Sequence, residues 1–228
     1  MTTRVLPAGD AAWLVELPER IDPEVNGRAI AIARAIEHAP LPVTDVVVGY
    51  RSVMVYVDPL ADGAGAVPAA LERIAADPGT QGATASRQID VPVCYDDPYG
   101  PDLADVAAFA GASVEEVIAL HLAREYRVFV VGFVPGFAYM ARVDPRIAAP
   151  RRASPRLKVP AGSVAIAAGQ TGIYPAPTPG GWHLIGRCPI RPYDPSRPAP
   201  FLLHAGDRVR FHRLSAEEYR AASQWGDA

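Results

Sequence analysis

The stretch from Lys158 to Arg187 is denser in glycine and proline than any other part of the chain. Proline fixes φ and removes a backbone N–H donor, whereas glycine permits positive φ and close approach of another backbone or a ligand. Such a run cannot form a helix. Its apolar residues predict short strands at Ser163–Ala168, Ile173–Tyr174 and Trp182–Ile185. Many short strands joined by Gly/Pro turns favour a β-barrel or sandwich over a doubly wound sheet.

The few polar side chains of this stretch are its candidate functional groups. His183 could act as a general acid or base near neutral pH, Arg187 could clamp a carboxylate or phosphate, and Lys158 could supply a point charge. Neutral hydrogen-bonding groups come from Gln170, Thr171 and Tyr174. If the last strand stays regular, His183 and Arg187 share one face about 13 Å apart and would flank a ligand. The alternative is a barrel corner in which these residues have only turn or surface roles.

The first 85 residues carry a structural pattern without a chemical signature. Asp22 and Pro23 predict a helix start, with a carboxylate at the N-cap and proline at the first helical position. The predicted order is strand, helix, strand, strand, helix, strand, at residues 12–17, 23–36, 45–48, 53–57, 67–75 and 87–93. This is the split βαβ pattern of ferredoxin-like domains. We predict an α+β protein with a ferredoxin-like α/β domain at 1–85 and a barrel domain at 86–228.

The second half opens with predicted helices and continues with aromatic turns. Asp102 and Ser113 are predicted N-caps, and Glu116 completes a capping box with Ser113. His121 borders an apolar helix face, where a hydrogen-bonded core histidine is the more common reading than a ligand. The run 132–140 places glycine and proline between aromatic residues, which suits either a packed corner or one wall of a cleft. Further strands are predicted at 201–203 and 208–211.

Composition excludes several classes of function. The net charge of −3 argues against a nucleic-acid partner, because phosphate binding needs a basic face. The two cysteines lack metal-ligand spacing, so no metal site is predicted. No stretch is long and apolar enough for a membrane span, and the start of the chain has no charged-then-apolar leader pattern, so we expect a cytoplasmic protein. The arginines at 151, 152 and 156 form either an anion patch or a solvated loop.

Three long motifs carry a family resemblance. They are GFVPGFAYM at 132–140, PR.KVPAGSVAIA at 155–167 and GQTGIYPAPTPGGWHLIGR at 169–187, and His121 and Tyr126 fit the same pattern. In this order they closely resemble the allophanate hydrolase subunit 1 family, also called the kinase A inhibitor family. Thr178 and Met140 depart from the family pattern without putting it in doubt.

The resemblance implies a fold, an activity and partners. The fold would be a small α/β domain followed by a cyclophilin-like β-barrel. The chain would be the B component of an ATP-dependent 5-oxoprolinase, a hydrolase that opens 5-oxo-L-proline to L-glutamate while ATP becomes ADP and phosphate. It would be active only with a larger homologous C component, of the allophanate hydrolase subunit 2 family, and with a third, A component. ATP would be shared with a partner.

The resemblance also extends the candidate site. Arg156 would join Lys158 and Arg187 at the phosphates, and the Gly/Pro stretch would form a cleft shared with the C component for 5-oxoproline or the nucleotide. The remaining expected contacts in that cleft are Pro135, Gly136, Phe137, Gly180 and Gly181. Two other readings stay open: an inhibitor of a sensor histidine kinase, and the carboxyltransferase half of a biotin-dependent, urea carboxylase-like enzyme. A Met-Lys-Met biotin site is absent from this chain.

Overall fold

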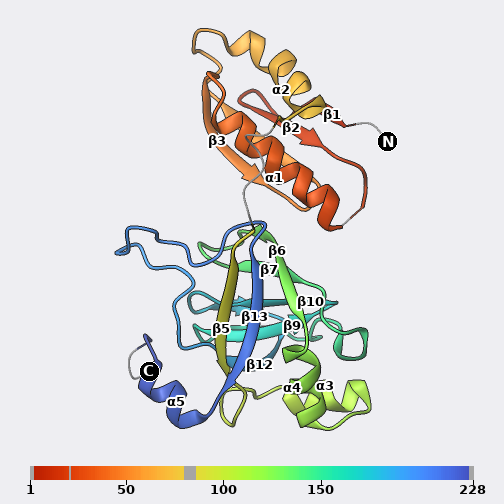
Figure 1. Cartoon of the computed structure of the whole chain (residues 1–228), viewed down its shortest axis with the longest axis vertical. Helices are drawn as coiled ribbons and strands as arrows, with labels where there is room; N and C mark the ends of the chain where they lie inside the picture. The colour runs from red at the N-terminus through yellow and green to blue at the C-terminus, as the bar shows by residue number, and fades with distance from the viewer. Residues whose placement is uncertain (1–2, 21, 80–85, 226–228) are drawn as a thin grey trace. The chain divides into compact units, whose positions relative to one another are not determined.

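The computed structural model describes residues 3–20, 22–79 and 86–225 (Figure 1). The chain divides into two compact units, Met1–Ser86 and Arg87–Ala228. Each unit has its own apolar core, so each is described by itself. Among the described residues, no helix combines the length and the apolar character that crossing a bilayer requires.

The N-terminal unit is a four-stranded antiparallel sheet packed against two helices. Its elements are β1 (Arg4–Pro7), β2 (Ala12–Glu16), α1 (Pro23–Glu37), β3 (Val43–Val48), β4 (Ser52–Val57), the 3-10 turn η1 (Ala64–Ala66) and α2 (Val67–Ala76). The carboxylate of Asp22 accepts from the backbone N–H groups of Glu24 and Val25, which confirms the predicted N-cap of α1. Alternate residues of β4 are buried against the helices, as expected for a sheet covered on one face.

The strand order corrects the predicted ferredoxin-like pattern. The sheet runs β1-β2-β4-β3, so the edge position beside β2 is held by β1, a strand that the sequence did not predict. The segment expected to fill that edge forms β5 (Gln88–Cys94) and belongs to the second unit. There it pairs in parallel with a strand near the end of the chain over seven residue positions, which holds it in the second unit.

The second unit is a closed barrel. Of the two predicted architectures, barrel and sandwich, the barrel is therefore the one that forms. Its strands follow the order β10-β7-β6-β13-β5-β12-β9. Their bounds are β6 (Glu125–Val131), β7 (Ala138–Ala141), β9 (Ser163–Ala167), β10 (Gln170–Ile173), β12 (His183–Arg187) and β13 (Arg208–Leu214), together with β5. Figure 1 shows β5 and β13 side by side. The strand predicted at 201–203 is wrong, because there only Phe201 forms a single bridge, with Tyr193.

Short elements surround the barrel. They are α3 (Leu103–Ala110), α4 (Val114–Leu122), the 3-10 turn η3 (Pro145–Ile147), α5 (Ala216–Ala222) and a two-stranded sheet of β8 (Arg156–Val159) with β11 (Thr178–Gly180). Capping boxes start α4 at Ser113 and α5 at Ser215, and the predicted box at Ser113 is confirmed. Asp102 occupies the N-cap position of α3, but its side chain makes no capping hydrogen bond.

The carboxylate of Asp102 instead ties three segments of the barrel unit together. It accepts a bidentate pair from Arg156 at 2.7 and 2.8 Å, a bond from Arg152 at 2.9 Å, and the backbone N–H of Leu184 at 2.7 Å. Burial alone raises the pKa of Asp102, but the bonds from Arg156 and Leu184 hold it below the ordinary carboxyl value. A buried charge is stable only when it is paired in this way.

His121 is a core histidine with both ring nitrogens satisfied. Thr171 donates its hydroxyl hydrogen to the carbonyl of Ala165, so the hydroxyl oxygen of Thr171 is the acceptor for His121 Nε2–H at 3.0 Å. On the other side of the ring, Tyr95 donates its hydroxyl hydrogen to His121 Nδ1 at 2.8 Å. The ring stacks on Phe211 with centroids 4.7 Å apart. This chain of hydrogen bonds fixes the neutral tautomer, and burial lowers the pKa of His121 to about 3.

The first prediction concerns Asp102. Replacing it with Asn (D102N) leaves two partly buried guanidinium groups without their carboxylate, so the free energy of unfolding should fall by about 2–4 kcal/mol. Urea denaturation measures this loss. Asp105→Asn is the matched control, because Asp105 is exposed and makes one 3.4 Å contact with Arg152. Equal losses in the two variants would contradict the anchoring role of Asp102.

The second prediction concerns pH. The unfolded chain binds a proton at His121 near pH 6.5, whereas the folded barrel binds it only near pH 3, so stability falls as pH decreases between these values. The contribution is up to about 1.4 kcal/mol per pH unit. His121→Gln should remove it, so the free energy of unfolding should depend less steeply on pH from 6.5 to 4.5. His212→Gln, at an exposed position, should keep the original slope. An unchanged slope in H121Q would rule out a neutral buried ring.

Candidate functional site

The segment from Tyr174 to Gly181 lies between two pockets of the barrel unit. Its first half, Pro175–Pro177, lines the larger pocket, and its second half, Pro179–Gly181, lines the smaller one. Pairing of β11 with β8 holds the segment in place, with Thr178 opposite Val159 and Gly180 opposite Arg156. The Gly/Pro-rich stretch singled out in the sequence therefore shapes both pockets.

The larger pocket, here called the cationic pocket, has a volume of about 620 Å³. Its charged lining residues are Lys158, Arg187 and Arg191, and no Asp or Glu is among the described residues that line it. Its remaining walls are prolines, alanines and two aromatic rings: Pro160, Ala161, Pro175, Ala176, Pro177, Tyr193 and Trp225. An apolar cavity with a few cations of one sign suits an anion that also carries an apolar part.

The three cations keep donors available to a ligand. Arg187 Nε donates to the carbonyl of Ala161 at 2.9 Å, and no hydrogen bond from its terminal nitrogens is seen in the described part of the chain. Arg191 Nε is buried without a partner, so its terminal nitrogens, for which no hydrogen bond is seen among the described residues, are the donors that a ligand could reach. Lys158 is exposed. Across residues 3–20, 22–79 and 86–225, none of the three pairs with a carboxylate.

The smaller pocket, here called the aromatic pocket, has a volume of about 270 Å³. Phe137 is its central ring and makes edge contacts with Tyr139, Tyr174 and Trp182 at centroid distances of 4.7–5.5 Å. Burial raises the pKa of Tyr174, so its hydroxyl stays protonated. Arg151 is the charged residue of the lining. Phe137, Tyr174, Gly180 and Gly181, all predicted binding residues, are thereby brought together.

A bulge in β12 separates His183 from Arg187. His183 pairs with Ile166 and Arg187 pairs with Ser163, so four steps along β12 match three along β9. A one-residue shift in pairing reverses the face of the strand on which the following side chains lie. His183 and Arg187 therefore lie on opposite faces of β12, and the expectation that they share one face is wrong. Arg187 lines the cationic pocket, whereas His183 lines neither pocket and places Nε2 3.0 Å from the carbonyl of Pro150.

This contact assigns one ring nitrogen of His183. A carbonyl only accepts, so Nε2 donates its hydrogen to Pro150, and in the neutral ring Nδ1 is the acceptor. Nδ1 is buried and has no partner in the described part of the chain. The ring thus has one open acceptor, which is compatible with a basic role toward a group that is not part of this chain.

Other predicted site residues have structural roles instead. Thr171 is fully buried and bonded to His121, so the expectation that it contacts a ligand is corrected. Both terminal nitrogens of Arg156 donate hydrogen bonds to the carboxylate of Asp102. Gln170 belongs to β10 and lines neither pocket, and Pro135 is exposed beside the aromatic pocket residues without lining it. Gly136 has φ +85° and packs against Tyr193, where a Cβ atom would meet the tyrosine Cβ at 2.5 Å.

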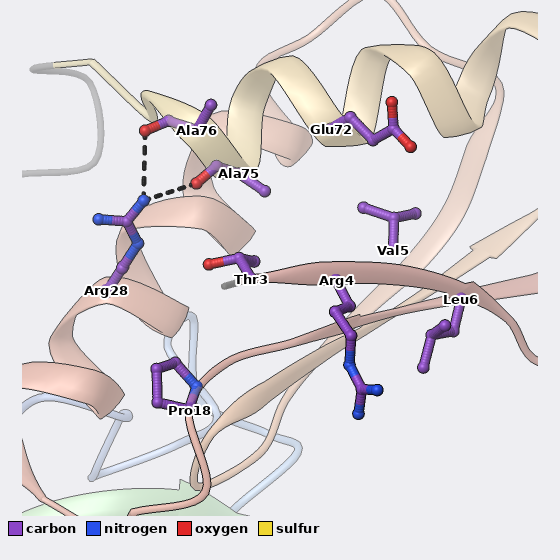
Figure 2. A pocket seen from close by; sticks show the side chains of 9 residues that line it. All are labelled: Thr3, Arg4, Val5, Leu6, Pro18, Arg28, Glu72, Ala75 and Ala76. Atoms are coloured by element: carbon purple, nitrogen blue, oxygen red, sulfur yellow. Dashed lines mark hydrogen bonds between the residues drawn. The ribbon is translucent and has the colours of Figure 1, made fainter. Parts of the chain in front are cut away.

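A third cavity, of about 700 Å³, lies in the N-terminal unit (Figure 2). Figure 2 shows the guanidinium of Arg28 directed at the carbonyls of Ala75 and Ala76, which it reaches at 2.8 and 3.2 Å. These are carbonyls at the end of α2, so Arg28 caps that helix. The other cation, Arg4, pairs with Glu16. Both cations are committed to the fold, so this cavity is a weaker anion site than the cationic pocket.

The sequence missed Arg191, Tyr193 and Trp225 in the cationic pocket, and it gave Arg151 no defined role. Arg191 and Trp225 meet although they are far apart in sequence, with the guanidinium carbon 5.6 Å from the ring centroid. The sequence signal that could have indicated Arg191 is the segment CPIRPY at 188–193. It follows Arg187 directly and continues the run of prolines and arginines. Among the described residues, no group of His, Cys, Asp and Glu side chains could hold a metal ion.

Comparison with known proteins shows the family to which the chain belongs. The family model described as carboxyltransferase domain, subdomain C and D, matches residues 3–203. The protein of Bacillus subtilis (strain 168) that is named as the B subunit of 5-oxoprolinase is 40% identical over 93% of each chain. The protein of the same name from Haemophilus influenzae is 36% identical over 91% of this chain and 96% of its own.

Solved structures show relatives with the same fold. The crystal structure of TTHA0988 is 40% identical with a TM-score of 0.79, and this chain covers 40% of that longer chain while 90% of this chain is matched. The urea carboxylase of Kluyveromyces lactis matches 95% of this chain and 22% of its own with a TM-score of 0.73 at 20% identity, which shows a shared fold. The chain therefore belongs to the carboxyltransferase subdomain C and D family, within the group of relatives named as the B subunit of 5-oxoprolinase.

Proposed function

We propose that this chain is the B component of an ATP-dependent 5-oxoprolinase and acts only together with the A and C components. The complex would convert 5-oxo-L-proline, ATP and two waters to L-glutamate, ADP and phosphate. Relatives named as this component align over almost the whole chain, which supports the assignment. We further propose that the barrel is of the cyclophilin-like type and that the complex is cytoplasmic.

The chemistry requires an anion site. An unstrained lactam is a stable amide. Transfer of the γ-phosphoryl group of ATP to the amide oxygen activates the ring carbon toward a first water, the ring C–N bond breaks with a proton going to the nitrogen, and a second water converts the resulting acyl phosphate to the carboxylate and free phosphate. Charge then accumulates on phosphoryl oxygens, which positioned cations stabilise. The single observation that carries the proposal is the cationic pocket, because Lys158 and Arg187 line a cavity without a balancing carboxylate in the described part of the chain.

The aromatic pocket supports a place for the lactam itself. Its volume of about 270 Å³ suits a small ring, and Arg151 could pair with the ring carboxylate while Phe137 and Trp182 cover apolar faces. His183 lies outside both pockets, so its proposed acid–base role would require a group from a ligand or a partner protein at Nδ1.

The third prediction is dependence on the other components. Mixing this chain with candidate A and C components, ATP and 5-oxoproline should yield glutamate and phosphate, and omission of any one component should abolish both. Glutamate by chromatography and phosphate by colorimetry are the measurements. Glutamate formed without this chain would contradict the proposed role, as would a full complex that binds together and turns nothing over.

The fourth prediction separates the candidate residues. In the complete complex, Arg187→Ala should lower turnover about 10- to 100-fold, since a charge-assisted contact is lost. Arg208→Ala is the control, because Arg208 makes an exposed pair with Glu125 away from both pockets. His183→Ala tests the general acid–base role. Full activity of both R187A and H183A would refute the proposed site.

A further inference from the structure

We propose that the cationic pocket binds a nucleoside triphosphate, and that Arg191 is a phosphate ligand beside Lys158 and Arg187. The identity of the nucleotide rests on the proposed function, whereas the class of ligand rests on the pocket. This inference places nucleotide binding on the present chain and involves residues outside the motifs that carry the family resemblance.

The charge pattern favours a polyphosphate over a simple carboxylate. A single carboxylate would be satisfied by one cation, but three cationic side chains line this cavity. None of the three forms an ion pair in the described part of the chain, and Asp194, the carboxylate near enough to interact with Arg191, is paired with Arg197. A triphosphate spreads several negative charges along a chain of atoms, so separate cations can each hold a different group. Guanidinium groups offer two parallel donors to such oxygens.

Arg191 is the residue with an unmet requirement. Its Nε is buried and has no hydrogen-bond partner among the described residues, and a buried donor without a partner is costly to the fold. The side chain is also held in place, since the guanidinium lies over Trp225 and the backbone N–H donates to Gln224 Oε1 at 3.1 Å. Because Nε has almost no accessible surface, the donors that a ligand in the pocket could meet are the terminal guanidinium nitrogens, for which no hydrogen bond is seen in the described part of the chain. A guanidinium held rigidly at the pocket wall is preformed for such a contact.

The remaining walls suit a nucleoside. The volume of about 620 Å³ falls in the range of small-molecule sites and exceeds what a small lactam would fill. Tyr193 and Trp225 supply ring surfaces, and Pro160, Pro175 and Pro177 supply rigid apolar surface. The indole N–H of Trp225 donates to the carbonyl of Cys188 at 2.8 Å, which fixes its ring at the edge of the cavity. A base could stack there while the phosphates reach the cations.

The fifth prediction tests binding by this chain alone. Calorimetric titration at low ionic strength should show binding of ATP and of inorganic pyrophosphate, and weaker binding of adenosine. Arg191→Met, which keeps apolar contact with Trp225, and Lys158→Ala should each weaken ATP binding at least about tenfold. Arg210→Ala should leave it unchanged, because Arg210 is at an exposed position of β13, pairs with Glu125 and lines neither pocket. Lys158 is exposed, so its variant remains informative if R191M fails to fold.

Three outcomes overturn the inference: no binding of ATP, binding that both variants retain in full, or equal binding of ATP and adenosine. A kinetic measurement separates this inference from the proposed function. In the complete complex, R191M should raise KM for ATP and leave KM for 5-oxoproline unchanged. Normal turnover with an unchanged KM for ATP refutes the nucleotide site and keeps the proposed function. ATP binding by a chain that supports no turnover keeps the site and refutes the proposed function.

Discussion

The carboxylate of Asp102 is the interaction on which the pocket architecture depends. One buried charge holds the start of α3, the strand β8 through Arg156, and the strand β12 through the N–H of Leu184. These segments are far apart in sequence, and apolar packing alone would not define their relative register. Directional, charge-assisted bonds do define it, because a displaced partner would leave a buried charge unpaired. Both pockets are built on segments that this carboxylate fixes.

Close backbone approach is the second constraint on the site. A Cβ atom at Gly180 would meet the hydroxyl oxygen of Tyr174 at 2.4 Å, and one at Gly186 would meet the carbonyl oxygen of Cys94 at 2.8 Å. The first glycine lets the tyrosine pack against the segment between the two pockets. The second lies at the bulge of β12, where the strand leaves regular pairing and turns Arg187 toward the cationic pocket. Several motif glycines therefore act through packing and need not touch a ligand.

The sequence predicted those features that depend on neighbouring residues. The caps at Asp22 and Ser113 are set by hydrogen bonds within a few positions, and the barrel follows from short strands between Gly/Pro turns. The prediction failed where distant partners decide. β1 is four residues long and ends in proline, so its strand signal is weak, and only pairing with β2 reveals it. Nothing in the sequence indicates that Asp102 forms an ion pair with Arg156. The bulge that places Arg187 on the other face of β12 also has no local sequence pattern.

The parallel pairing of β5 with β13 has a consequence for how the protein is made. β5 begins the barrel unit and β13 nearly completes it. Their pairing places Gln88 opposite Arg208 and Cys94 opposite Leu214. A chain that emerges from the ribosome from its N-terminus cannot close the barrel until Leu214 has left the exit tunnel. The first unit can fold while the second is still being synthesised, but β5 to β12 must wait with apolar faces exposed. That interval is where a chaperone, or an already folded partner, would most influence the yield of active protein.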